Sequence, residues 1–358
     1  MKSAERAAIL ARAAHRFPLL GTVTANDLID VVRLELGHAE ILDGFRPYAG
    51  GFSRAVPIDP VLHVISGNTP HAGLQSLIRG LLVGARNFVK LPSGGLPEVE
   101  EFVGLLPPSL RETVVTSTDL PEGWLQESKA WIVFGSDQTI SHFQRRLPSG
   151  IVFEAHAHRI SLGIVFDDAR GDSAPLAAAD VARFNQKGCL SPHDFYVATE
   201  AKGYAARLAK ALAQHELKNP RGTITPLEAA EIADTRANYR FRSANDSRVA
   251  IWESKNSTAW TVIYEEDTWF ASSCLNRVVF VKPLPPHLQS ALGPASSWVA
   301  AVGIWPATHE YAERAAVLQP SRICPLGYMQ NPPFSWHQEG RQTLAPLVRW
   351  VDFEPNFR

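Results

Sequence analysis

The segment FNQKGCLSPH (184–193) places one of only three cysteines in the chain between a glycine and a leucine, shortly before a proline. A cysteine becomes a useful nucleophile when its thiolate is partly accessible and is stabilised by donors or positive charge. Gly188 lets a substrate approach the backbone, and Lys187 and His193 can each favour the thiolate. Cys189 is therefore a candidate nucleophile, with a small buried hydrophobic residue as the alternative interpretation.

Three other positions with chemical potential stand at the ends of predicted strands. Asn68 follows one strand, where its amide can donate to a developing oxyanion. Lys90 ends another, and parallel sheets bind ligands at the carboxyl ends of their strands. Gly135 and Ser136 lead into a helix N-terminus, which suits a phosphate or pyrophosphate. Each also has a structural explanation, since Asn68 and Ser136 can cap helices and Lys90 can be a solvated charge.

The elements that must position these residues alternate along the first half of the chain. Apolar runs at 61–67, 87–93 and 130–135 predict buried strands, and the patterns at 70–86 and 136–147 predict helices. Strand–helix–strand repetition predicts a parallel α/β sheet.

The second half continues this pattern. A helix is expected at 204–217, and Thr225 with Glu228 forms a capping box for another. A hairpin is expected around 255–258, and the apolar stretch 344–353 is a candidate edge strand.

Composition argues against several classes of function. The 35 basic and 36 acidic side chains nearly cancel, so no nucleic-acid or anionic-membrane partner is expected. No apolar run approaches the ~18 residues of a membrane span. The segment 1–17 is typical of an amphipathic helix rather than of a signal peptide. Three widely spaced cysteines favour a reducing compartment, and a soluble, cytoplasmic protein is predicted.

The order of these motifs along the chain resembles that of a known family. Asn68, then Lys90, then Phe-Gly-Ser at 134–136, then Phe-Asn-Gln before Cys189 resembles the aldehyde dehydrogenase superfamily. Within it, the chain is most similar to the LuxC-type acyl-CoA reductases, the fatty-acyl reductase subunits. The segments that carry this are HVISGNTPHAG, FVKLPS, VFGSDQTI, NQKGCLSPH, RICPLGYMQNPPFSWHQEGR and LAPLVRWVD, within about Phe45 to Asp352.

The resemblance implies an α/β, aldehyde dehydrogenase-like fold with two parallel-sheet domains and a small oligomerisation extension. Residues 1–167 would form the nicotinamide cofactor-binding domain with an N-terminal helical segment. Residues 168–335 would form the catalytic domain. Residues 336–358 would form a C-terminal extension with an oligomerisation strand.

The resemblance also implies roles for the candidate catalytic residues. Cys189 would attack an acyl thioester and hold the acyl group, and a nicotinamide hydride would then reduce it to the aldehyde. Asn68 and the backbone N–H of Cys189 would hold the oxyanion. His193 would orient or protonate groups in the active site.

The cofactor-binding candidates come from the same resemblance. Lys90 matches the lysine that reaches the adenosine ribose. Three places later, where relatives preferring NAD commonly have an acidic residue, this chain has Ser93 followed by two glycines. Serine accepts a 2′-phosphate that a carboxylate repels, so NADPH is expected over NADH. The full set of cofactor-binding candidates is Ser66, Lys90, Ser93, Gly135 and Ser136.

Glu154 lies near the position of the superfamily's glutamate base, which activates water to hydrolyse the acyl-enzyme. The Leu-Gly-Gly that follows the glutamate in the superfamily is replaced here by Ala-His-Ala. A weakened or repositioned base fits a reductase, which gains nothing from hydrolysis. His156 and His158 alternate on a strand without a clear third ligand, so no metal is expected.

Three alternatives remain open at this point: an oxidative aldehyde dehydrogenase, a non-catalytic subunit that kept the fold, and a cysteine hydrolase or acyltransferase using Cys189 and His193. The expected partners are an acyl-CoA or acyl-carrier substrate, an acyl-transferring partner enzyme, and further copies of the chain in a homodimer or higher oligomer.

Overall fold

The computed structural model describes residues 1–48, 50–67, 72–169 and 171–355, and the chain forms two compact units. The first unit comprises Met1–His158 and Pro332–Arg358, and the second comprises Arg159–Asn331. This division differs from the expected boundaries at 167 and 335. β8 (Ile160–Val165) pairs with strands of the second unit, and β15 (Val348–Phe353) pairs with a strand of the first.

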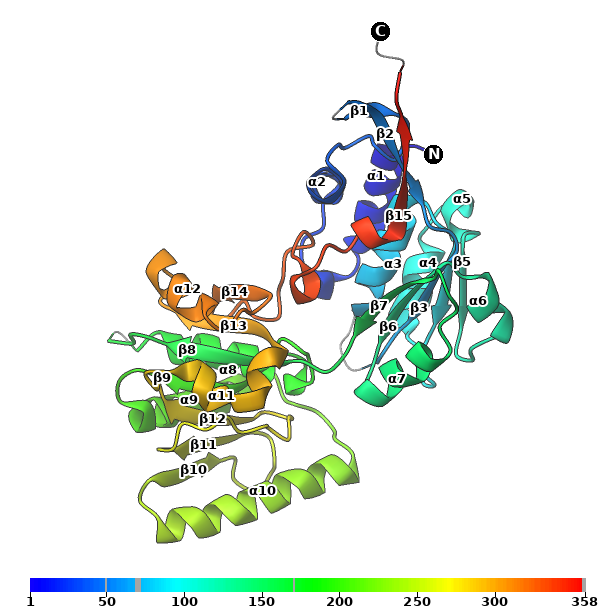
Figure 1. Cartoon of the computed structure of the whole chain (residues 1–358). Coiled ribbons are helices and arrows are strands. Elements are labelled where there is room, and N and C mark those ends of the chain that lie inside the picture. Colours follow the sequence, from blue (N-terminus) through cyan, green and yellow to red (C-terminus); the bar gives the residue numbers. More distant parts are fainter. Residues whose placement is uncertain (49, 68–71, 170, 356–358) are drawn as a thin grey trace. The chain divides into compact units, whose positions relative to one another are not determined.

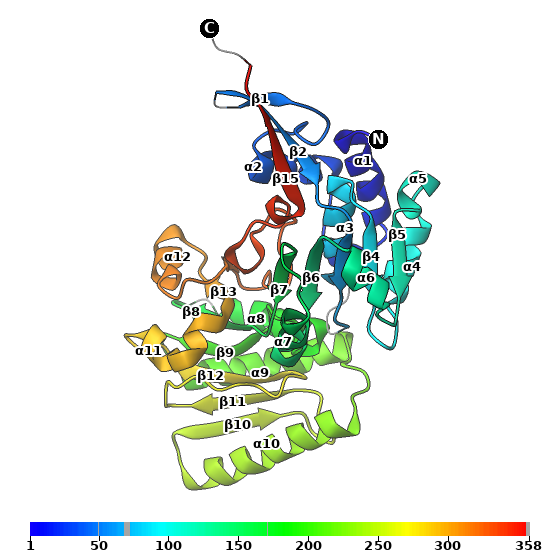
Figure 2. The same cartoon turned by 45° about the vertical axis from the view of Figure 1, so that its right-hand side comes forward.

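The first unit contains a five-stranded parallel sheet, in the order β5-β4-β3-β6-β7 (Figures 1 and 2). The strands predicted at 61–67, 87–93 and 130–135 are confirmed as β3, β4 and β6. Alternate residues enter two cores: Val61 packs in one, whereas Leu62 and Trp131 pack in the other. The strands are β3 (Val61–Val64), β4 (Asn87–Lys90), β5 (Val114–Ser117), β6 (Ala130–Phe134) and β7 (Val152–His156).

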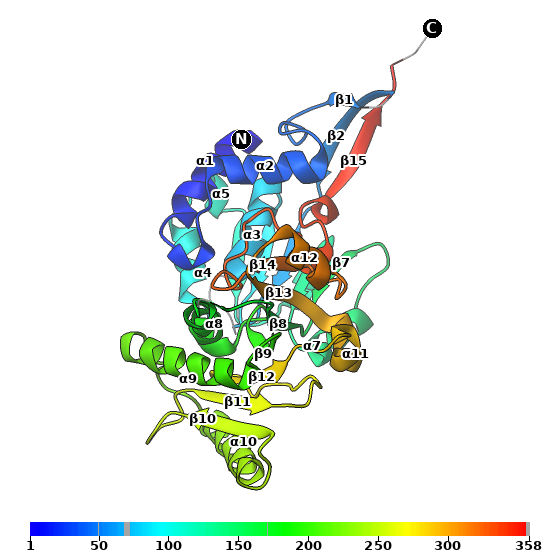
Figure 3. The same cartoon turned by 90° about the vertical axis from the view of Figure 1, so that its left-hand side faces the viewer.

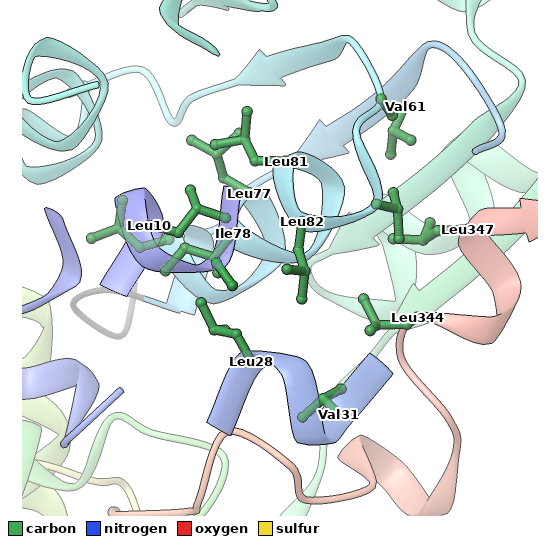
Figure 4. Packing of buried hydrophobic residues seen from close by; sticks show 14 of the residues in the cluster. Leu10, Leu28, Val31, Val61, Leu77, Ile78, Leu81, Leu82, Leu344 and Leu347 are labelled. Atoms are coloured by element: carbon green, nitrogen blue, oxygen red, sulfur yellow. The ribbon is translucent and has the colours of Figure 1, made fainter. Parts of the chain in front are cut away.

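Helices of the first unit bury regularly spaced apolar side chains. In α3, leucine and isoleucine recur at 74, 77, 78, 81 and 82, the spacing of one helix face. That face packs against Leu10 of α1, Leu28 of α2 and Leu344 near the C-terminus (Figures 3 and 4). The helices are α1 (Ser3–Ala14), α2 (Ala25–Leu36), α3 (Ala72–Val83), α4 (Pro97–Gly104), α5 (Pro108–Arg111), α6 (Glu122–Glu127) and α7 (Asp137–Arg145), with short 3₁₀ turns η1 (Pro18–Leu20), η4 (Gln338–Gly340) and η5 (Ala345–Leu347).

A separate three-stranded antiparallel sheet also belongs to the first unit, in the order β1-β2-β15. β1 spans Arg46–Tyr48 and β2 spans Gly51–Pro57. The candidate edge strand is confirmed as β15, which pairs with β2 from Val348 opposite Pro57 to Phe353 opposite Phe52.

The second unit is built on a seven-stranded sheet, in the order β10-β11-β12-β9-β8-β13-β14 (Figure 1). Its pairs are parallel except for the β10–β11 hairpin, which confirms the turn predicted around 255–258. The remaining strands are β9 (Pro192–Val197), β10 (Val249–Glu253), β11 (Thr261–Glu265), β12 (Val278–Pro283), β13 (Val299–Trp305) and β14 (Arg322–Pro325).

Long helices accompany this sheet, and α10 lies beside β10 (Figure 1). The predicted capping box opens α10: Thr225 accepts the Glu228 N–H, and Glu228 accepts the Thr225 N–H. No helix in the described part of the chain is long and apolar enough to cross a membrane. The helices are α8 (Ser173–Ala182), α9 (Ala201–Lys218), α10 (Pro226–Asn245), α11 (Leu288–Leu292) and α12 (His309–Ala316), with 3₁₀ turns η2 (Arg183–Gln186) and η3 (Gly293–Trp298).

A buried histidine on β3 makes stability depend on pH. His63 is fully buried, with Nδ1 2.8 Å from Ser76 Oγ and Nε2 3.0 Å from Asn87 Oδ1, and burial lowers its pKa to about 4. As pH falls from about 6.5 to about 4, His63 becomes protonated in the unfolded chain but stays neutral in the folded chain. Proton binding therefore favours the unfolded state, and the folded state loses stability over this range. We expect His63 to remove up to roughly 3 kcal/mol of unfolding free energy across that window.

Urea unfolding at pH 7 and pH 5 tests this, with His63→Gln as the non-titrating comparison. The variant should lose less stability than the wild type between the two pH values. Equal losses in both proteins would contradict the assignment.

Candidate active site

The loop that carries Cys189 begins with three consecutive residues in the left-handed region. Phe184 and Asn185 have φ of 53° and Gln186 has φ of 64°. Such conformations cost roughly 1–3 kcal/mol each for residues other than glycine, and surrounding contacts must hold them. The chain then turns from Gly188 to Ser191, closed by the Ser191 N–H donating to the Gly188 carbonyl at 2.9 Å. Cys189 is a central residue of this turn, and its side chain is exposed.

A second left-handed stretch supports the first. Leu275, Asn276 and Arg277 have φ of 64°, 54° and 67°. The Asn276 N–H donates to the Asn185 carbonyl at 3.0 Å, and the Asn185 amide donates to the Arg221 carbonyl at 3.0 Å. The first bond joins the two left-handed stretches and the second fixes the Asn185 side chain to Arg221, so tertiary contacts set the conformation of the cysteine loop.

Lys187 forms an ion pair with a carboxylate of the same unit. Its ammonium lies 2.5 Å from Glu228, the residue that also caps α10. The hydrogen bond from Lys187, followed by the backbone bond at Thr225, lowers the pKa of Glu228 to about 2. The structure thus pairs Lys187, which the sequence suggested as a stabiliser of the thiolate, with the Glu228 carboxylate.

His193 lies on β9 and is buried. Its Nδ1 accepts a hydrogen bond from the Ser273 N–H at 3.1 Å, which places the proton of the neutral ring on Nε2. Ser273 Oγ in turn donates to the Val278 carbonyl.

The cofactor-binding candidates gather at the carboxyl edge of the five-stranded sheet. Ser66 follows β3 and Lys90 ends β4. Gly135 follows β6, where a Cβ would lie 2.8 Å from Thr139, so only glycine fits. Ser136 then caps α7 by accepting the Thr139 N–H at 3.3 Å. Ser93 is exposed in the loop after β4, and Asn68 lies outside the described residues.

Together these residues fit a dinucleotide. The strand ends and the α7 N-terminus are features that bind pyrophosphate groups, and Gly135 allows α7 to begin directly after β6. The loop at 91–97 has no acidic side chain, and a Cβ at Gly94 or Gly95 would have no atom within 4 Å.

Glu154 and His156 lie on one face of β7, where the C-terminal segment meets them. Arg341 Nη1 lies 3.8 Å from Glu154 Oε2, and His156 Nδ1 lies 2.8 Å from Glu339 Oε1. The His156 ring stacks on Phe134 with centroids 4.4 Å apart. Both β7 side chains line a cavity, and this segment therefore controls the surroundings of Glu154 within the first unit.

Several residues around Cys189 were not anticipated: Ser161, Glu228, Ser273, Asn276 and Gln330. Ser161 Oγ donates to the Cys189 carbonyl at 2.8 Å and accepts the Ala301 N–H at 3.1 Å. Gln330 lies in the family-like segment at 322–341, which could have drawn attention to it, whereas Glu228 was expected only as a helix cap.

Solved structures share the fold. Aldehyde dehydrogenase C of Pseudomonas syringae, solved with NAD⁺ and octanal, matches with a TM-score of 0.69 at 13% identity over 99% of this chain and 85% of that chain. An aldehyde dehydrogenase of Bacillus cereus in complex with NAD⁺ matches with a TM-score of 0.69 at 13% identity over 100% and 85%. The predicted aldehyde dehydrogenase-like fold with parallel-sheet α/β domains is confirmed.

Sequence comparison identifies the family. The long-chain acyl-protein thioester reductase of Aliivibrio fischeri is 20% identical over 351 residues, which cover 92% of this chain and 71% of the relative. That of Vibrio harveyi is 22% identical over 343 residues, covering 91% and 71%. The model of the acyl-CoA reductase (LuxC) family matches residues 5–350. The chain therefore belongs to the acyl-CoA reductase (LuxC) family, which confirms the prediction of an enzyme that reduces acyl thioesters.

Proposed function

We propose that the protein reduces an acyl thioester to the aldehyde with NADPH, through an acyl group held on Cys189. The observation that carries the proposal is the exposed thiol of Cys189 on a turn fixed by two left-handed stretches, in a chain of this family. A loop that is costly to form and presents a thiol to solvent is typical of a functional position.

In this proposal the Cys189 thiolate attacks the thioester carbonyl, and the carrier thiol leaves with a proton. The backbone N–H of Cys189 and the Asn68 amide hold the oxyanion during attack. A bound nicotinamide cofactor supplies the hydride that reduces the acyl group. Hydride addition would leave an oxyanion on the former acyl carbon, and its collapse breaks the C–S bond, releases the aldehyde and restores the Cys189 thiolate. Lys187 is paired with Glu228, so in this proposal the oxyanion is held by the backbone N–H of Cys189 and the Asn68 amide.

The substrate we propose is a long-chain acyl group. Support comes from the relatives, which are named long-chain acyl-protein thioester reductases. The deciding assay follows NADPH oxidation with acyl-CoA thioesters of graded length and with the same chains on a carrier protein. Aldehyde and free thiol in equal amounts would support the proposal, and cofactor binding without turnover on any thioester would contradict it.

The oxidative alternative is disfavoured by the surroundings of Glu154. A base for hydrolysis must be free to take a proton from water, and Glu154 lies next to the Arg341 guanidinium. The products separate the two activities, because hydrolysis of the acyl-enzyme yields acid without consuming NADPH.

NADPH preference gives a further prediction, since Ser93 stands where a carboxylate would repel the 2′-phosphate. Ser93→Glu should lower kcat/KM for NADPH by roughly 10- to 100-fold while leaving that for NADH nearly unchanged. Initial rates with each cofactor at saturating thioester measure this. The matched control is Ser109→Glu, which adds the same charge at an exposed position of α5. An equal effect of Ser93→Glu on both cofactors would contradict the role of Ser93.

We also propose a homo-oligomer joined through the β1-β2-β15 sheet, which exposes Tyr48, Phe52, Trp350 and Phe353. Sedimentation of the full chain against a Trp350→Glu variant tests the oligomer.

We further propose a reducing, cytoplasmic location, which suits an exposed nucleophilic thiol that must stay reduced.

A further inference from the structure

A buried glutamine holds both ends of the turn that contains Cys189. Gln330 is 7% exposed, and its side chain lies so close to Gly188 that a Cβ there would meet Nε2 at 2.7 Å and Oε1 at 2.8 Å. The same Nε2 donates to Ser191 Oγ. Gly188 and Ser191 are the first and last residues of the turn, so one amide group contacts the chain on both sides of the nucleophile.

The segment that carries Gln330 is itself clamped by two charged side chains. Asp180 on α8 is 2% exposed and accepts the Gly327 N–H at 2.5 Å and the Met329 N–H at 3.0 Å, one on each oxygen. Arg322 on β14 donates to three carbonyls of the same segment: Met329 at 2.6 Å, Tyr328 at 2.9 Å and Asn331 at 3.2 Å. Five backbone groups around Gln330 are therefore satisfied by one carboxylate and one guanidinium.

This arrangement uses the carboxylate form of Asp180. Burial raises the pKa of Asp180 to about 7, and the bonds from Gly327 and Met329 and the charges of Arg322 and Arg183 oppose that rise. A buried charge held by hydrogen bonds and an opposite charge fixes the geometry of the groups it contacts.

We propose that Gln330 is a positioning residue for Cys189, presented to the turn by the segment that Asp180 and Arg322 clamp. The inference rests on the proposed function, in which Cys189 supplies both the attacking sulfur and a backbone donor to the oxyanion. A displacement of this turn moves both groups at once, and displacements of about 1 Å can cost roughly 100-fold in rate. Ser161, which donates to the Cys189 carbonyl, holds the same turn from β8.

Steady-state kinetics of Gln330→Ala test the inference, with Gln214→Ala on the exposed face of α9 as the matched control. We expect kcat for thioester reduction to fall roughly 10- to 100-fold in Gln330→Ala. KM for NADPH should stay within about twofold, because the cofactor candidates belong to the first unit. Gln214→Ala should behave as the wild type, and an unchanged kcat in Gln330→Ala would overturn the inference.

Gln330→Met is the second variant, because it keeps the side-chain volume while removing the amide. Its kcat should fall as in Gln330→Ala, and combining either variant with Ser191→Ala should add less than the two single effects together. Full additivity, or wild-type activity of Gln330→Met, would overturn the inference.

Amide hydrogen exchange separates this inference from the proposed function. Exchange in a peptide covering 187–191 should quicken in both Gln330 variants, and peptides of the first-unit sheet should be unaffected. Unchanged exchange at 187–191 would overturn the positioning role. Faster exchange, together with a wild type that turns over no thioester, would retain the structural link and reject the reductase proposal.

Discussion

Cys189→Ala is expected to lower kcat/KM for NADPH-dependent thioester reduction by at least about 10⁴-fold, because loss of a nucleophile removes the covalent path. The side chain is exposed on its turn, so alanine removes the sulfur without opening a core cavity. Cofactor oxidation and aldehyde release measure the loss. Tryptophan fluorescence quenching by NADPH should be unaltered, since the proposed cofactor residues belong to the first unit.

The other two cysteines provide matched controls. Burial raises the pKa of Cys324 to about 11, and burial also raises the pKa of Cys274, which accepts a hydrogen bond from Thr235 at 3.7 Å. Both thiols therefore remain protonated and unreactive near neutral pH. Cys274→Ala and Cys324→Ala should retain turnover, and iodoacetamide should inactivate the wild type by labelling Cys189 alone. Substantial activity in Cys189→Ala would reject the covalent mechanism.

Lys282→Met should lower the unfolding free energy by roughly 3–5 kcal/mol, the usual cost of leaving a buried charge without its partner. Lys282 is fully buried on β12, and its ammonium donates to Glu265 at 2.7 Å and Asp267 at 3.2 Å. Burial raises the pKa of Asp194 well above its usual range, and the Lys282 charge opposes that rise. Removing the ammonium leaves the carboxyl groups of Asp194, Glu265 and Asp267 with less positive charge near them.

Urea unfolding at pH 7 measures the effect. Lys255→Met, at the exposed turn of the β10–β11 hairpin, is the matched control and should change stability by less than about 0.5 kcal/mol. A loss below about 1 kcal/mol in Lys282→Met would show that Arg242, 2.7 Å from Glu265, neutralises the group by itself.

The parallel sheet of the first unit could be predicted because local signals agree there. Apolar β-branched runs stand between glycines and polar loop residues, and those at 61–67 and 130–135 are each followed by a helix pattern. The capping box at Thr225 and the position of Ser136 as a cap were likewise visible, because both depend on residues within four positions of each other.

The environment of Cys189 could not be predicted in the same way. Neither Phe184 nor Leu275 is a residue that favours positive φ, and contacts between segments about ninety positions apart stabilise both turns. The Lys187–Glu228 and Gln330–Ser191 contacts are also distant in sequence. Periodicity and turn propensity contain no information about such pairs.

The two compact units divide at a different residue from the expected boundary at 167, for a related reason. The segment 151–167 mixes apolar residues with polar ones such as Glu154, His156 and Arg159, and no glycine–proline turn signal within it marks where one strand ends and the next begins. In the structure β7 and β8 join different sheets, with Ala157 to Arg159 between them. A run of apolar residues indicates burial but does not specify which sheet buries it.

The pairing of β15 with β2 has a consequence for biosynthesis. The second unit is one continuous stretch, so a ribosome delivers all of it before the last strand of the first unit exists. The edge of β2 that pairs with β15 stays unpaired while roughly 290 further residues are translated at about 5–20 residues per second. For some tens of seconds the nascent chain therefore presents an open strand edge, which is the kind of surface that chaperones protect.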